Sequence, residues 1–329
     1  MAKIKDVAEL AGVSVSTVSR VLCNGPVSDK VRKRVEAAMA KLDYRPNLAA
    51  RRLRSQHTDT IGLIVSDIRN PFFTAVSRAV EDEAYRNGMR VILCNTDESP
   101  EKEAMYLKLM REERVTGVIL APTRHSVAAL DPESLGFPVV MIDRTPAQGD
   151  GDAVVLDNRR AAAQLVEHLL AAGYRDIGGL FGNTSSTGAE RHAGFAEALT
   201  HAGLPSPARF VPPSVEAAEA AVTAWLAEPD RPRALLISNG IFLLGAVRAI
   251  KAAGLCLPQD LALAGFDNEV WTSLIDPGLT VIEQPVDEIG RSAMAMLLAR
   301  LEDPARSHRH VVLQGKLVAR GSSAPLRQR

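Results

Sequence analysis

The spacing of apolar residues divides the chain into two regions. After residue 60, short aliphatic runs alternate with longer amphipathic stretches. Such runs are typical of buried strands in a parallel sheet, and the stretches between them are typical of covering helices. The first series of predicted strands comprises 61–65, 91–93, 118–120 and 139–142, and the second comprises 153–156, 177–181, 235–238 and 261–266. Two consecutive series predict two doubly wound α/β lobes with parallel sheets.

The beginning of the chain has a helical pattern instead. A short helix is predicted at 6–11, Gly12 ends it, and Ser14 is suited to cap a second helix at 15–22. A third helix is predicted to begin at Ser28 and to end near Tyr44. Two short helices joined by a tight glycine turn are typical of a helix-turn-helix, whose second helix enters the DNA major groove. The side chains expected to face outward from that helix are Val15, Ser16, Ser19 and Arg20. The alternative is a small helical bundle with a charged surface.

An arginine-rich segment follows at 47–54. Helices shorter than about 12 residues are marginal in water, so this segment is not expected to hold a helix by itself. On DNA, its three arginines would meet phosphates and Leu53 would offer an apolar wedge to the minor groove. The alternative is a charged linker.

The formal net charge of zero hides an uneven distribution. Residues 1–60 carry twelve Lys and Arg against six Asp and Glu, a net charge of +6, and the remainder carries 27 against 33, a net charge of −6. A basic segment of this size favours binding to a polyanion. The composition, 46% hydrophobic and 24% charged, excludes a generally disordered chain. No apolar run is as long as a membrane span, which needs about 18 residues, and no apolar core of a signal peptide follows Met1. We therefore expect a cytoplasmic protein without membrane contact.

Polar and aromatic side chains follow most of the predicted strands, where ligands bind in parallel sheets. Amide, carboxylate and guanidinium groups form directional hydrogen bonds with hydroxyls, and aromatic faces pack on the C–H surface of a sugar. The candidate effector contacts are Asp67, Phe72, Phe73, Arg144, Ser185, Arg191, Asn239, Asp267, Trp271 and Gln284. Alternatives remain open: the Asp and Asn residues as helix caps, the two phenylalanines as core, and Asp143–Arg144 as a surface ion pair.

Motifs of common enzymes are absent from the sequence. There is no G-x-S-x-G, no phosphate loop ending in Gly-Lys-Ser/Thr and no H-E-x-x-H. Gly178, Gly179 and Gly182 have the wrong spacing for a dinucleotide turn, and His308 and His310 lack a third metal ligand. The three cysteines lie far apart, which supports neither a disulfide framework nor a zinc cluster. We therefore expect no enzymatic activity, no cofactor and no metal.

A family resemblance rests on motifs along nearly the whole chain. IKDVAELAGVSVSTVSRVL, YRPN, AARRLRS, TIGLIV and NPFF, then GVIL, ERHAGF, GFDN and LTVIEQP, are similar to the lactose- and galactose-repressor (LacI/GalR) family of bacterial transcriptional regulators. The resemblance implies two periplasmic-binding-protein-like lobes and a homodimer that reads a near-palindromic double-stranded operator. It also implies hinge helices that fold on the operator and push Leu53 into a central base step. Its effector cleft implies contacts from Phe72, Phe73, Arg144, Arg191, Asn239, Asp267 and Gln284.

The resulting domains are a helix-turn-helix DNA-binding domain at 1–46, a hinge helix and linker at 47–59, and an effector-binding and dimerisation domain at 60–329. The chain is expected to cross between the two lobes near 158, 285 and 318. The expected operator contacts are Ile4, Ser14, Val15, Ser16, Thr17, Ser19, Arg20, Asn24, Ala50, Arg51, Leu53 and Arg54. One departure from the family pattern is Cys23, where Asn is common; the turn that follows at Asn24 offers a substitute polar contact.

The function expected from these observations is a repressor whose operator affinity is controlled by a small molecule. A second departure is Asn239-Gly240 in place of an Asn-Asp pair, which removes a carboxylate while Arg144 and Arg191 remain. Unpaired guanidiniums favour anions, so a sugar acid of the gluconate or ketogluconate type is one hypothesis, beside a neutral sugar. The alternatives are a regulator with a purine or nucleoside corepressor, and a sugar-handling enzyme or binding protein.

Overall fold

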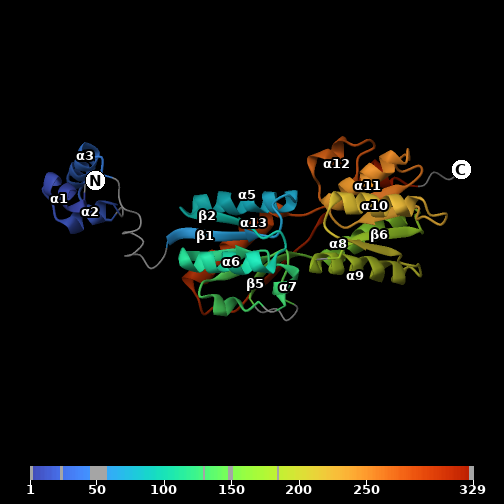
Figure 1. Cartoon of the computed structure of the whole chain (residues 1–329), viewed down its shortest axis with the longest axis horizontal. Coiled ribbons are helices and arrows are strands. Elements are labelled where there is room, and N and C mark those ends of the chain that lie inside the picture. Colours follow the sequence, from blue (N-terminus) through green and yellow to red (C-terminus); the bar gives the residue numbers. More distant parts are fainter. Residues whose placement is uncertain are drawn as a thin grey trace. The chain divides into compact units, whose positions relative to one another are not determined.

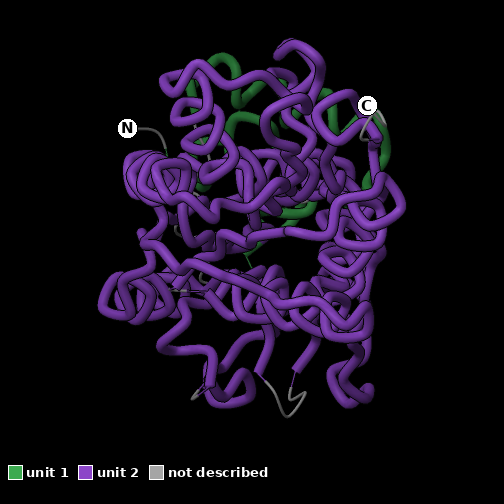
Figure 2. Tube along the Cα trace, turned by 90° about the vertical axis from the view of Figure 1, so that its right-hand side faces the viewer, with its two compact units in different colours: residues 1–58 green, residues 59–329 purple. Residues whose placement is uncertain are grey.

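The computed structural model describes residues 3–22, 25–44, 58–128, 130–146, 151–183 and 185–325. The chain forms two compact units, Met1–Thr58 and Asp59–Arg329, which are coloured separately in Figure 2. Among the described residues, no helix combines the length and the apolar character needed to span a bilayer.

The first unit contains the three predicted helices. They are α1 (Ile4–Ala11), α2 (Val15–Leu22) and α3 (Asp29–Lys41). Gly12 ends α1 with φ 60°, in the left-handed region that favours glycine, and the Ser14 hydroxyl accepts a hydrogen bond from Thr17 N at 3.1 Å. The buried side chains that hold the helices together are Val7, Ala8, Ala11, Val18, Val21, Val35 and Ala38. The helix-turn-helix pattern predicted from the sequence is therefore present.

The second unit contains two lobes, each built on a six-stranded sheet (Figure 1). The strands of the first sheet are β1 (Thr58–Val65), β2 (Arg90–Asn95), β3 (Val115–Leu120), β4 (Val139–Ile142), β5 (Asp152–Leu156) and β11 (His310–Leu313), in the order β11-β5-β4-β3-β1-β2. Its helices are α5 (Pro71–Arg86), α6 (Pro100–Glu112), α7 (Arg124–Val127), the 3-10 helix η1 (Pro132–Leu135) and α13 (Val286–Glu302). Apolar side chains of α5 and α13 form one core against this sheet, and those of α6 contribute to a second core.

The second lobe repeats this arrangement. Its strands are β6 (Ile177–Gly182), β7 (Ala208–Val211), β8 (Ala234–Ile237), β9 (Ala262–Phe266), β10 (Thr280–Glu283) and β12 (Lys316–Val318), in the order β12-β10-β9-β8-β6-β7. Its helices are α8 (Asn158–Ala171), α9 (Ser186–His201), α10 (Val215–Leu226), α11 (Gly240–Ala252), α12 (Val270–Leu274) and the 3-10 helix η2 (Gly321–Ser323). Cores on the two faces join α8 and α9 on one side and α10 and α11 on the other. The pairing of β10 with β12 is antiparallel, and the other pairs with a described register are parallel.

The assignment of one strand to the second lobe was wrong. The run at 153–156 belongs to β5, which pairs in parallel with β4, with Met141 opposite Ala153, so it joins the first sheet. The chain leaves the first lobe after β5, returns between β10 and α13, and crosses again between β11 and β12. That third crossing lies at 314–315, a few residues before the expected position 318. Gly315 fits there because a Cβ would come within 2.5 Å of an Ile282 methyl.

Candidate functional site

A cleft between the two lobes is lined by the segments that follow the strands of both sheets. The residues that line it are Asp67, Arg69, Asn70, Phe72, Phe73, Asp97, Glu98, Asp143, Arg144, Gly182, Ser185, Thr187, Gly188, Arg191, Pro213, Ser238, Asn239, Ile241, Phe242, Asp267 and Gln284. The cavity measures about 130 Å³. Nine of the ten candidate effector residues from the sequence are brought together here.

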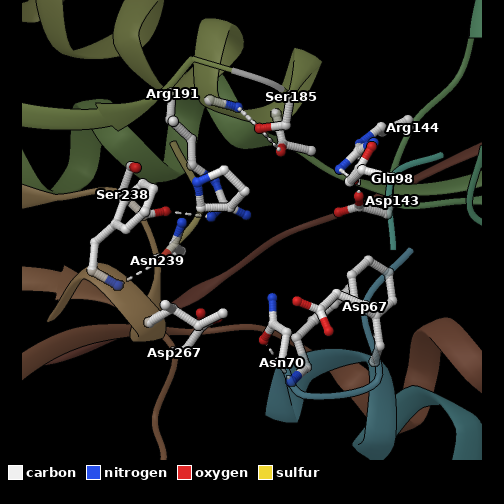
Figure 3. Close-up of a pocket in the computed structure, with 18 of the residues that line it drawn as sticks. Asp67, Asn70, Glu98, Asp143, Arg144, Ser185, Arg191, Ser238, Asn239 and Asp267 are labelled. Carbon is white, nitrogen blue, oxygen red and sulfur yellow. Dashed lines mark hydrogen bonds and ion pairs between the residues drawn. The ribbon is translucent and has the colours of Figure 1, made fainter. Parts of the chain in front are cut away.

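Arg144 lies on the wall formed by the first lobe, and it forms ion pairs with two acids, Glu98 and Asp143 (Figure 3). Its Nη1 and Nη2 donate to the two carboxylate oxygens of Glu98 at 2.9 and 2.6 Å, and its Nε lies 3.1 Å from Asp143 Oδ2. Burial acts to lower the pKa of Arg144, but Asp143 and Glu98 raise it above its ordinary value. Burial also raises the pKa of Asp143, against the opposing effect of Arg144 and Arg191. The premise of an unpaired guanidinium at Arg144 was therefore wrong, and Asp143–Arg144 is not a surface pair.

Arg191 lies on the opposite wall, formed by the second lobe. Its Nε donates to Asn158 Oδ1 at 2.8 Å, its Nη1 donates to the Ser238 carbonyl at 2.5 Å, and its guanidinium lies 4.0 Å from the centre of the Phe266 ring. Burial lowers the pKa of Arg191, against the opposing effect of Asp267 and Asp143. Because these hydrogen-bond partners are neutral, Arg191 carries a positive charge into the cleft without a directly bonded carboxylate from the described part of the chain.

Asp267 connects the end of β9 to the crossing that follows β10. It accepts hydrogen bonds from Gly240 N at 2.8 Å and from Gln284 Nε2 at 2.6 Å. Asp143 after β4 and Asp267 after β9 both have positive φ, 66° and 75°, in a region that Asp tolerates better than most residues. Asp97 and Glu98, with φ of 50° and 59°, share this feature on the loop after β2. Within the described residues, Asp97, Glu98, Asp143 and Asp267 therefore bring left-handed backbone to one cleft, and such strain is often found at functional sites.

The alternatives considered for the polar and aromatic candidates are partly correct. Ser185 caps α9 through a bond from Gly188 N, and Asn239 caps α11 through a bond from Phe242 N. Phe72 and Phe73 belong to the core of the first lobe, with ring centres 5.0 Å apart. These four residues also line the cleft, so a capping or core role and a cleft position coincide.

Trp271 is the candidate that the structure does not bring to the cleft. It lines a neighbouring groove instead, and its Nε1 donates to Glu269 Oε2 at 2.7 Å. The side chain of Glu269 turns toward Gly240: a Cβ at Gly240 would lie 2.4 Å from Glu269 Oε1. A carboxylate therefore occupies the space that a larger side chain at position 240 would need.

Sequence reasoning missed several residues of the cleft. Asp97, Glu98 and Ser238 line it, and Asn158 orients Arg191 from behind. Asp97 and Glu98 follow β2, a strand that the sequence did predict, so a search after every strand would have found them. Asn158 follows β5, whose assignment to the wrong lobe concealed its position.

The candidate operator contacts divide by exposure. Ser14, Ser16 and Arg20 are exposed on and before α2, whereas Ile4 and Val15 are half-buried against the core of the helix-turn-helix. Thr17 and Ser19 are also half-buried, and the Thr17 hydroxyl is 2.8 Å from that of Ser14. The remaining candidates lie outside the described residues: Asn24, Ala50, Arg51, Leu53 and Arg54.

Comparison with known proteins agrees with both units. The family described as "Bacterial regulatory proteins, lacI family" matches residues 3–47, and the "Periplasmic binding protein-like domain" matches residues 166–323. The chain is 32% identical to the HTH-type transcriptional regulator DegA of Bacillus subtilis (strain 168), over 98% of each chain. The chain belongs to the LacI family. This LacI-family member is also 33% identical to the HTH-type transcriptional repressor PurR of Yersinia pestis bv. Antiqua, over 98% of this chain and 97% of the relative.

The fold of this LacI-family chain matches that of a solved repressor. A structure described as the Lac repressor dimer bound to operator and the anti-inducer ONPF aligns with a TM-score of 0.88, at 28% identity, over 98% of this chain and 99% of the other. Its relatives are transcriptional regulators and not enzymes, so the LacI-family chain is a DNA-binding transcriptional regulator of the repressor type. The resemblance and the fold class predicted from the sequence are confirmed.

The contribution of the Glu98–Arg144 ion pair to the stability of the protein can be tested. Glu98→Gln is expected to lower the free energy of unfolding by about 2 kcal/mol, because it removes a charge partner from a buried guanidinium that keeps Asp143. Urea unfolding followed by tryptophan fluorescence measures this, since both tryptophans lie in the second unit. Glu112→Gln, which breaks an exposed pair with Lys108 on α6, is the matched control and should change stability by less than about 0.5 kcal/mol. Equal effects of the two substitutions would contradict the assigned pairing.

Proposed function

We propose that this regulator binds its operator as a homodimer and that a single-ring sugar in the cleft controls operator affinity. The observation that supports the sugar is the cleft lining, which combines carboxylates, amides and hydroxyls with the rings of Phe72, Phe73 and Phe242. Carboxylates and amides bind hydroxyl groups directionally, and aromatic rings pack against C–H surfaces.

The size of the cavity supports a single ring. An engineered cavity of about 150 Å³ holds one benzene molecule, and the cleft measures about 130 Å³. A cavity of this volume takes a monosaccharide more readily than a disaccharide or a nucleoside. A free purine base is no larger than a monosaccharide, so the carboxylates, amides and hydroxyls of the lining, and not the volume, favour the sugar over a purine.

The charges of the cleft favour a neutral sugar over a sugar acid. Among the described residues, five carboxylates line it against three guanidiniums, and two of those guanidiniums have carboxylate partners: Arg69 with Asp67, and Arg144 with Glu98 and Asp143. Within this described lining, Arg191 remains as the partner for an acidic effector. An added anion would face a net negative wall, so hydroxyl groups are the better match.

Calorimetry with matched pairs tests the effector class. A neutral aldose is expected to bind about tenfold more tightly than its aldonic acid, and hypoxanthine is expected to bind more weakly than either. Tighter binding of the acid would restore the sugar-acid hypothesis, with Arg191 as its partner. Tight binding of hypoxanthine with no response to sugars would contradict the proposal.

Operator binding is assigned to the first unit and the arginine-rich segment that follows it. The exposure of Ser14, Ser16 and Arg20 on or before α2 supports contacts with base edges and phosphates, and the net charge of +6 on residues 1–60 would attract the phosphate backbone. We propose that Arg51, Leu53 and Arg54 complete the contact in the minor groove.

Exposed apolar side chains of the second unit support the homodimer. Val270 and Leu274 on α12 and Tyr85 on α5 are each more than three-quarters exposed, and Leu93 and Met105 are about half exposed. Neighbouring exposed apolar residues, such as Val270 and Leu274 on α12, are typical of contacts with other proteins, and a second copy of the chain would cover them symmetrically.

A further inference from the structure

A buried hydroxyl group without a hydrogen-bond partner lines the cleft at Ser238. Among the described residues, the buried side-chain polar atoms without such a partner are Thr60 Oγ1, Ser77 Oγ, Arg144 Nε, Arg231 Nη1 and Ser238 Oγ. Of these residues, Arg144 and Ser238 line the cleft, and Arg144 Nε lies within ion-pair distance of Asp143. Ser238 therefore stands apart as a hydroxyl at the cleft that the protein itself does not satisfy.

The backbone of Ser238 is held by hydrogen bonds on both sides. Its N–H donates to the Leu180 carbonyl at 3.0 Å, and its carbonyl accepts from Arg191 Nη1 at 2.5 Å. Ser238 follows β8, and the next residue, Asn239, caps α11. None of these bonds uses the Ser238 hydroxyl, and the residue is only 2% exposed. A buried polar group left in this state costs its full desolvation until a ligand supplies a partner.

We propose that Ser238 is a specificity-determining contact, whose hydroxyl group pairs with a hydroxyl group of the bound effector. This inference rests on the proposed sugar effector. A serine hydroxyl donates one hydrogen bond and accepts others, so it matches a sugar hydroxyl, which does the same. A ligand that reaches both Ser238 and the acids on the wall of the first lobe bridges the two lobes. Through Ser238, binding of one particular effector hydroxyl would therefore depend on the arrangement of the lobes.

The test compares Ser238→Ala with Ser77→Ala in the full chain. Ser77 carries the same kind of unpartnered buried hydroxyl on α5 but does not line the cleft. Calorimetry first identifies the neutral monosaccharide that binds the wild-type chain most tightly, and that sugar and its monodeoxy analogues are the probes. Ser238→Ala is expected to weaken binding of the parent sugar about tenfold, whereas Ser77→Ala leaves it unchanged. Neither variant should melt below the wild type without ligand, because each removes a hydroxyl that the folded protein leaves unpaired.

The monodeoxy analogues distinguish a direct contact from an indirect effect. One deoxy position should cost about tenfold in affinity for the wild type and almost nothing for Ser238→Ala, because the two removals delete the same bond. Unchanged affinity in Ser238→Ala, or identical losses for every analogue in both proteins, overturns the inference and leaves the proposed function intact. A wild-type chain that binds no sugar overturns the proposed function, and the Ser238 contact with it.

Discussion

Replacement of Arg191 by Met is expected to abolish the response of operator binding to effector. The effector affinity should fall by about 100-fold or more, because the variant removes a buried, hydrogen-bonded charge that faces the cleft. Operator affinity should then stay at its effector-free value at effector concentrations that saturate the wild type. Calorimetry measures the loss of binding, and mobility-shift titration with and without the sugar measures the loss of response.

The reason for such a large effect is the position of Arg191 between the two ends of the site. Asn158 and the Ser238 carbonyl hold its guanidinium from within the second lobe, and Asp143 of the first lobe contributes to its electrostatic environment. A cation placed in this way favours the arrangement in which acids of both lobes approach it. An effector that contacts Arg191 and binds more tightly to that arrangement of the lobes increases its population. Such a difference in affinity is required for coupling between the effector site and the operator site.

Two further variants separate charge from geometry. Arg191→Lys retains the positive charge but loses the two directed bonds, so it should recover only part of the effector affinity. Arg248→Ala, which breaks an exposed and loose pair with Glu219 on the same lobe, should behave as the wild type. A normal effector response in Arg191→Met would exclude Arg191 from the site.

The alternation of strands and helices could be predicted from the sequence, but the sheet that each strand joins could not. Apolar periodicity reports that a segment is buried, and it carries no information on the neighbouring strand. The run at 153–156 follows β4 closely and precedes α8 of the second lobe, so its sequence position fits either lobe. The pairing of β5 with β4 and β11 assigns this run to the first sheet, and β11 lies more than 150 residues later in the chain.

The residues of the candidate site could also be predicted only in part. Positions after strands were predictable because parallel strands place their carboxyl ends at one edge, and nine of ten candidates line the cleft for this reason. The pairing of Arg144 with Glu98 depends on a loop 46 residues earlier and on left-handed backbone at Glu98, which has no local sequence signal. The prediction for Trp271 was wrong because closeness in sequence did not bring it to the cleft. It lies only four residues after Asp267, but it lines the neighbouring groove.

Replacement of Val18 by Asp is expected to abolish specific operator binding while leaving effector binding intact. Val18 is fully buried at the centre of the core that joins α1, α2 and α3. A core in a domain of this size supplies only about 3–5 kcal/mol, and burial of an unpaired carboxylate costs a comparable amount or more. The helix-turn-helix should therefore unfold, and operator affinity should fall to the non-specific level, a loss of roughly 1,000-fold.

The stability of the second unit should not change in Val18→Asp, because this unit has its own cores and none of them includes a residue of the first unit. Thermal melting followed by tryptophan fluorescence is expected to give the wild-type transition, with the same upward shift on addition of the sugar. Arg20→Ala is the matched control on the same helix: the exposed side chain leaves the fold unchanged, and its loss should weaken operator binding about 10- to 100-fold. Loss of the sugar-induced shift in Val18→Asp would show that the two units do not fold independently. Retained operator binding would remove α2 as the element that reads DNA.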